Sequence, residues 1–132
     1  MKLKTRDIVY IGFIAALCAV ATTIRIEIPG GAMVHLGSAA LFTSSILFGG
    51  LYGGLGAAIG SALFDLFGGH TQYIVFSFFI KGIAGLIVGG MTAGYLPPSI
   101  TKPTASFTRI LIALIIGTIW TAFGYFLAWW FV

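Results

Sequence analysis

The sequence predicts an all-α integral membrane protein: a bundle of five transmembrane helices that forms a single domain over residues 1–132. The first observation is composition. The chain is 59% hydrophobic and 8% charged, whereas a soluble domain carries roughly 25% charged residues. The second is that apolar runs recur along the chain, and a helix needs about 20 such residues to cross a bilayer. Lipid is therefore the expected solvent for most of the surface.

The expected spans follow from these runs and their breaks: 7–27, 36–51, 53–69, 72–95 and 107–131. The uncharged run 36–64 is ambiguous. As one helix it would measure about 43 Å, longer than the ~30 Å hydrocarbon core. A hairpin turning at "GGLYGG" returns Lys102 and Arg109 to the side of the basic N-terminus, as the positive-inside rule requires. We therefore expect the hairpin, five spans, a multi-pass chain in the cell membrane and a cytoplasmic N-terminus.

The charged residues also exclude several function classes. The net charge is +4, but the basic residues flank apolar runs instead of forming a patch, so nucleic acid is not an expected partner. Cys18 is the one cysteine, which rules out a disulfide within the chain. No paired carboxylate, activated nucleophile or phosphate-binding loop is present, so we expect neither an enzyme nor a cofactor.

Glycine is unusually frequent, at 19 residues, and its spacing is regular. Pairs of small residues four apart let helices approach closely in lipid, where apolar surface alone gives no drive to associate. The pairs are Gly49–Gly53, Gly50–Gly54, Gly56–Gly60, Gly85–Gly89 and Gly90–Gly94, with Gly12–Ala16 and Ala15–Ala19 in the first span. They exceed what five short helices require, so at least one small-residue face is expected to meet a partner in the membrane.

Asp65 and Lys81 are the only formally charged residues between Leu36 and Thr101. An unpaired charge in the bilayer core costs about 2.5–3.5 kcal/mol on insertion scales. The two residues belong to neighbouring antiparallel spans, in the half of the membrane away from the N-terminus. They are expected either to form an ion pair that pins these spans or to line a ligand pocket, and the two roles are compatible.

Polar side chains gather above these charges, in the loops on the same side. The two histidines there lack a third ligand with suitable spacing, so a metal site is not expected. Aromatic residues at the same end of the last span form either an interfacial belt or a wall for a flat ring. The residues concerned are His35, His70, Thr71, Gln72, Tyr73 and Ser77, and the aromatic Tyr125, Trp129 and Trp130.

Three motifs resemble the S components, the substrate-binding subunits of energy-coupling factor vitamin transporters. They are "HLG" at the start of the second span, the Gly-rich hairpin "FGGLYGGLGAAIGSAL" followed by Asp65, and "IKG" in the fourth span. Within that superfamily, the chain looks closest to the group of hydroxymethylpyrimidine and pyridoxine-type carriers. Relatives often carry an Asp after "HLG" where this chain has Ser38. They also have six spans, and their pocket usually includes the sixth.

The resemblance implies a protein that binds a vitamin or vitamin precursor tightly from outside. It would dock through its first helices onto a transmembrane coupling (T) subunit, which is driven by two cytoplasmic ATPase subunits. From the charged pair, the polar groups above it and the aromatic end of the last span, we expect these ligand-binding residues: His35, Asp65, His70, Gln72, Tyr73, Ser77, Lys81 and Trp129. The implied docking face is Gly12, Ala15, Ala16 and Ala19. The competing hypotheses are a small self-associating channel or exporter and a non-transporting assembly protein.

Overall fold

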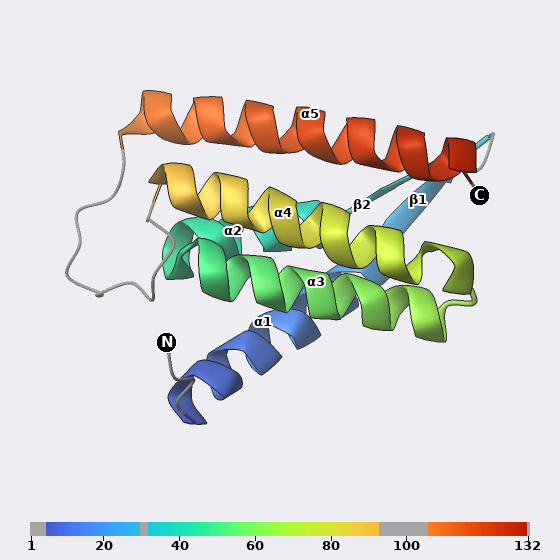
Figure 1. Cartoon of the computed structure of the whole chain (residues 1–132), viewed down its shortest axis with the longest axis horizontal. Helices are drawn as coiled ribbons and strands as arrows, with labels where there is room; N and C mark the ends of the chain where they lie inside the picture. The colour runs from blue at the N-terminus through green and yellow to red at the C-terminus, as the bar shows by residue number, and fades with distance from the viewer. Residues whose placement is uncertain (1–4, 30–31, 93–105, 132) are drawn as a thin grey trace.

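The computed structural model describes residues 5–29, 32–92 and 106–131. The chain runs through α1 (Thr5–Thr23), β1 (Arg25–Ile28), β2 (Ala32–His35), α2 (Gly37–Phe48), α3 (Gly50–Phe67), a 3-10 turn η1 (Thr71–Tyr73), α4 (Ile74–Thr92) and α5 (Phe107–Phe131). Five helices make up the bundle in the described part of the chain, which confirms the all-α membrane class (Figure 1).

Four stretches are long and apolar enough to cross a membrane: α1, α3, α5 and Thr71–Thr92, which joins η1 to α4. The exception is α2, whose 12 residues measure about 18 Å against a hydrocarbon core of ~30 Å. The expected span 36–51 is therefore too long. The helix ends at Gly49, whose φ of 94° lies in a region that glycine adopts without steric cost.

The segment between α1 and α2, which the predicted spans leave as a loop, contains an antiparallel β-hairpin. Its register pairs Arg25 with His35 and Ile28 with Ala32. A backbone hydrogen bond of 3.2 Å from the Leu36 N–H to the Ile24 carbonyl closes the base of the hairpin. The segment "RIEI" alternates polar and apolar residues, which is the signal of a strand.

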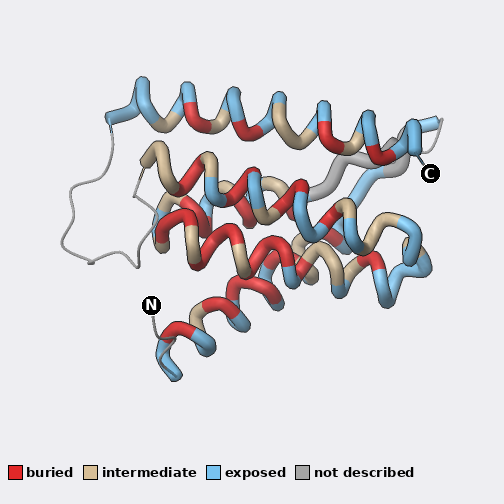
Figure 2. The backbone as a smooth tube through the Cα atoms, in the orientation of Figure 1, coloured by how far each residue is buried: buried red, intermediate tan, exposed pale blue. Residues whose placement is uncertain are grey.

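The central helix is α3, which packs against α1, α2 and α4, while α5 packs on α4. Buried positions concentrate where α1, α3 and α4 face one another, and the outer side of α5 is exposed (Figure 2). The start of α1, the α2–α3 turn, the end of α4 and the start of α5 share one end of the bundle, and the hairpin and η1 share the other (Figure 1). This arrangement agrees with the predicted hairpin at "GGLYGG".

Glycines bring α3 and α4 into backbone contact. A Cβ at Gly89 would lie 2.2 Å from the Gly50 nitrogen, and one at Gly85 would lie 2.6 Å from the Gly54 Cα. On the other side of α3, a Cβ at Gly60 would lie 2.5 Å from the carbonyl oxygen of Ala15 in α1. Most of the small-residue pairs are thus used inside the chain, which removes the argument that their number alone requires a partner.

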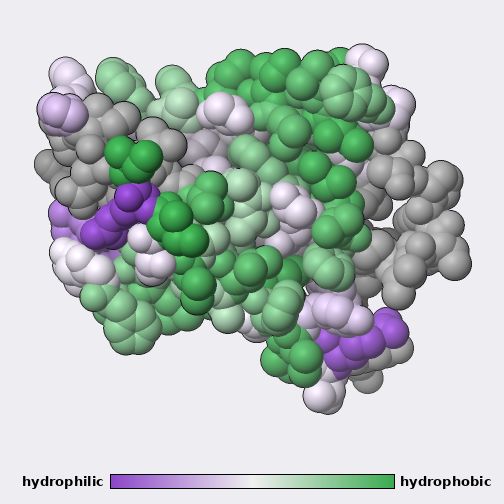
Figure 3. All heavy atoms as spheres, turned by 180° about the vertical axis from the view of Figure 1, so that it is seen from behind, coloured by the Kyte–Doolittle hydropathy of each residue, from purple (hydrophilic) through white to green (hydrophobic). Residues whose placement is uncertain are grey.

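The surface agrees with a lipid environment. Large apolar side chains are exposed on every long helix. Figure 3 shows hydrophobic residues over the middle of the molecule, while the hydrophilic ones gather toward its two ends. Apolar surface this extensive is unusual on soluble proteins. At the end that holds the start of α1, the Tyr52 hydroxyl of α3 donates a hydrogen bond to the Asp7 carboxylate, so both polar groups are buried with a partner.

Candidate functional site

Lys81 lies in the interior of α4, with only 3% of its surface exposed. Its ammonium donates a hydrogen bond to the Ser38 hydroxyl of α2, with Nζ and Oγ 2.9 Å apart. Nζ also lies over the ring of Tyr125 in α5, 5.5 Å from the ring centroid. A cation over a tyrosine face is stabilised by the ring quadrupole. Lys81 therefore ties α2, α4 and α5 together through one hydroxyl and one ring.

Asp65 lies near the end of α3 and is 8% exposed. Its carboxylate interacts electrostatically with Ser77, His70 and Lys81. One carboxylate oxygen, Oδ2, is buried and has no hydrogen-bond partner among the described residues. Buried polar atoms in proteins almost always have one. An acceptor thus remains available inside the bundle.

The direct ion pair between Asp65 and Lys81, one of the two expected arrangements, is not formed. Within the described part of the chain, Lys81 has its hydrogen bond to Ser38 instead. The two charges still act on each other at longer range. The reason is geometric, because α2 begins directly after β2 and its first turn brings the Ser38 hydroxyl to the ammonium.

Ser77 connects the two charges. It is 1% exposed and lies one helical turn from Lys81 in α4. Its hydroxyl shares a hydrogen bond of 2.8 Å with the Tyr125 hydroxyl. We call Ser38, Asp65, Ser77, Lys81 and Tyr125 the polar cluster. It draws one or two residues from each of α2, α3, α4 and α5, so its geometry depends on the packing of all four helices.

Aromatic stacking closes the bundle above Asp65. The guanidinium of Arg25, at the start of β1, lies 5.4 Å from the Phe64 ring centroid. The Phe64 ring stacks on His70 with centroids 6.1 Å apart. The backbone N–H of His70 donates a hydrogen bond of 2.9 Å to the backbone carbonyl of Asp65, and the buried Nδ1 of the His70 ring has no partner among the described residues. The β-hairpin is thereby attached to the α3–α4 turn directly above the polar cluster.

The structure separates the predicted ligand residues into two groups. Asp65, Ser77 and Lys81 meet in the polar cluster, with His70 directly above them. The others do not join it: Gln72 is exposed and Tyr73 is half-buried in η1, and Trp129 is 64% exposed on α5. His35 lies in β2, and its side chain is outside the described part.

Two members of the polar cluster were absent from the predicted set. Tyr125 had been assigned with Trp129 to an aromatic wall or belt, yet only Tyr125 turns its ring to Lys81. Ser38 had been noted only as a departure from an Asp in relatives. Ser38 is the residue that contacts Lys81, but an uncharged serine in a membrane helix gives no sequence signal of that role.

The residues of the predicted docking face on α1 also differ in burial. Ala15 is 3% exposed and packs against Gly60 of α3, so it cannot belong to a free surface. Gly12 and Ala16 are exposed, and Ala19 is half-buried beside them. Nothing lies within 4 Å of a Cβ built on Gly12. The exposed small-residue face is therefore Gly12, Ala16 and Ala19, and Ala15 is corrected to a core residue.

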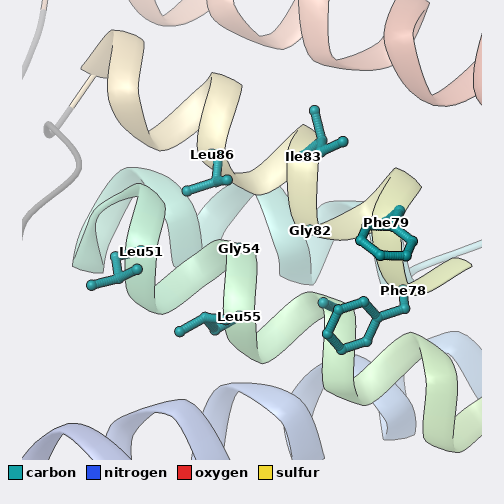
Figure 4. A pocket seen from close by; sticks show the side chains of 9 residues that line it. Leu51, Gly54, Leu55, Phe78, Phe79, Gly82, Ile83 and Leu86 are labelled. Atoms are coloured by element: carbon teal, nitrogen blue, oxygen red, sulfur yellow. The ribbon is translucent and has the colours of Figure 1, made fainter. Parts of the chain in front are cut away.

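A shallow apolar groove runs between α3 and α4 on the surface (Figure 4). Glycine and alanine form its floor, and Phe78 and Phe79 close one end. Its lining is Leu51, Gly54, Leu55, Ala58, Phe78, Phe79, Gly82, Ile83 and Leu86. The side chains that line the groove are all apolar. Among the described residues, no three His, Cys, Asp or Glu side chains come together as a metal site.

Comparison with known proteins gives two matches. The model of the family described as "ECF-type riboflavin transporter, S component" matches residues 2–132. An uncharacterized protein of Pyrococcus woesei, named from a gap 3' region, is 32% identical over 111 residues, which cover 83% of this chain and 68% of that protein. No solved structure matches.

Proposed function

Because the chain belongs to the family of ECF-type riboflavin transporter S components, we propose that it captures a vitamin-like molecule in the polar cluster and delivers it to an ATP-driven complex. Membership makes it a membrane subunit of a vitamin transporter that works with T and ATPase subunits, and not an enzyme. The ligand, the binding residues, the docking face and the orientation are the parts that we propose.

The observation that carries the binding site is the unused hydrogen-bonding capacity of the polar cluster. Leaving a buried acceptor unsatisfied costs about 1–3 kcal/mol, and Asp65 Oδ2 is such an acceptor. A ligand that donates to it would recover this energy. The Tyr125 ring beside Lys81 would supply a flat face for a heteroaromatic ring.

The proposed orientation places this cluster in the outer half of the membrane. Arg6 and Arg109 begin α1 and α5 at the same end of the bundle (Figure 1), and basic residues favour the cytoplasmic side. The cluster lies toward the other end, since Asp65 is in the last turn of α3 and Lys81 is about 10 Å from the start of α4. A ligand would enter from outside, past the β-hairpin.

For delivery, we propose that Gly12, Ala16 and Ala19 receive a helix of the T subunit. Gly12 and Ala16 are exposed on α1 with Ala19 half-buried beside them, and small side chains let a second backbone approach closely. The lipid-facing groove between α3 and α4 is on a different surface and takes no part in this proposal.

The ligand class needs its own test. The sequence resemblance favours a hydroxymethylpyrimidine or pyridoxine-type ligand, while the matched family is named for riboflavin. All three are flat heteroaromatic compounds with hydroxyl groups, which is the chemistry that the polar cluster suits. We propose this class and treat the choice among its members as the experimental question.

The deciding experiment is native mass spectrometry of the protein purified in detergent, alone and with its T and ATPase subunits. We expect a co-purified small molecule in the isolated protein, and uptake into vesicles only with the complete complex. Ion conduction by the isolated protein, without ligand and without those subunits, would contradict the proposal and favour a channel.

A further inference from the structure

The two buried charges in the polar cluster are opposite in sign but do not contact each other. Lys81 contributes one positive charge and Asp65 one negative charge, so the cluster is formally neutral. Each nevertheless keeps free bonding capacity: an ammonium has three N–H donors, of which the described residues accept one, and Asp65 Oδ2 has no donor. The site therefore presents a separate donor and a separate acceptor.

This arrangement restricts the charge of an occupant. A ligand with a net charge would leave that charge uncompensated inside the bundle, and a buried charge without its partner is strongly unfavourable. Within the described residues, Lys81 is the one cation in the cluster. The Arg25 guanidinium lies outside the polar cluster, over the Phe64 ring.

We propose that the polar cluster selects a ligand without net charge, which accepts a hydrogen bond from Lys81 and donates one to Asp65, and that it rejects the phosphate ester of the same compound. This inference rests on the proposed function and adds to it the charge class of the ligand. A ring with an acceptor atom and an N–H or O–H donor on one edge meets both requirements, and a phosphate adds negative charge that no second buried cation offsets.

Binding is measured by titration calorimetry on the full chain in detergent, with three pairs of probes. The pairs are riboflavin with flavin mononucleotide, pyridoxine with pyridoxine phosphate, and hydroxymethylpyrimidine with its phosphate. For any free compound that binds, we expect its phosphate to bind at least about a hundredfold more weakly, in line with the cost of an unpaired buried charge. Any co-purified ligand should also carry no net charge.

Charge variants make the test specific to the cluster. Asp65→Asn leaves Lys81 as a net positive charge, so the preference for the free compound over its phosphate should fall by at least about tenfold. Asp7→Asn removes a carboxylate at the opposite end of the bundle, where it bonds to Tyr52, and should leave that preference unchanged. Because both affinities are measured on the same variant, partial loss of folded protein cancels in the ratio.

The outcomes separate the two proposals. Equal or tighter binding of a phosphate ester, a charged co-purified ligand, or an unaltered preference in Asp65→Asn would overturn the inference while a binding function stands. If no probe binds and no small molecule co-purifies, the proposed function itself is wrong, and the inference falls with it.

Discussion

The ammonium of Lys81 in α4 donates a hydrogen bond of 2.9 Å to the hydroxyl of Ser38 in α2. This neutral partner leaves the charge of Lys81 in place, where an aspartate would have neutralised it. The contact also positions α2, the shortest helix of the bundle, against α4. Ser38 therefore has a structural role and an electrostatic one, and each can be tested.

Ser38→Ala should lower the free energy of unfolding by about 1.5–3 kcal/mol, because hydrogen bonds to charged groups contribute on this order. The measurement is reversible unfolding in mixed micelles. Ser45→Ala is the matched control, since this serine is also in α2 and buried, but its hydroxyl has no partner. The control should be neutral or stabilising. Equal destabilisation by both changes would argue against a specific bond to Lys81.

Gly89→Ala should destabilise the fold by about 1–3 kcal/mol, the usual cost of overpacking. Its new Cβ would meet the Gly50 backbone, which cannot move aside as a flexible side chain could. Gly12→Ala provides the comparison, because its Cβ would meet nothing within 4 Å and alanine favours helix. Thermal unfolding of both variants in the same detergent distinguishes them. A Gly89 variant as stable as the Gly12 variant would contradict the backbone contact between α3 and α4.

Ala16→Leu should abolish vitamin uptake and leave ligand affinity unchanged, because it enlarges an exposed position on the proposed docking face of α1. Uptake into vesicles and binding in detergent are measured on the same variant. Ala122→Leu makes the same change on the exposed side of α5 and should preserve both activities. Ala15→Leu should instead damage the fold, since Ala15 is buried against α3. Normal uptake by Ala16→Leu would place the docking surface elsewhere.

His70→Cys should react with a membrane-impermeant thiol reagent added outside intact cells, whereas Ser106→Cys should not. His70 belongs to the hairpin end of the bundle, and Ser106 precedes α5 at the opposite end. The native Cys18 is buried and gives a low background. The reverse labelling pattern would invert the proposed orientation and place the polar cluster near the cytoplasm.

Charged residues were the part of the site that sequence reasoning found most readily. Asp65 and Lys81 stand out because a charge within an apolar run has few structural explanations. Ser38 gives no such signal, since serine is common in membrane helices. Similarly, the sequence could not tell which of Tyr125 and Trp129 faces inward, because this depends on the exact rotation of α5 against α4.

The fold, too, could be predicted from the sequence only in part. Five helices and a turn within "GGLYGG" could be predicted from apolar length and glycine content, but the end of α2 at Phe48 could not. The rotation of α1 could not, because Gly12, Ala15, Ala16 and Ala19 share one helical face by their spacing, and the sequence does not say which edge of that face packs on α3. The alternating pattern in "RIEI" is a weak signal of a strand, since a short segment between spans is usually a loop.

The backbone contact between α3 and α4 has a consequence for how the protein enters the membrane. Glycines at Gly50, Gly54, Gly85 and Gly89 give neither helix a large apolar side chain along that face, and α4 also carries Lys81. Insertion of α4 alone would expose this ammonium to lipid, at a cost of about 2.5–3.5 kcal/mol. The short connection through η1 lets the two helices leave the translocon as one hairpin, so biosynthesis is expected to treat them as a single unit.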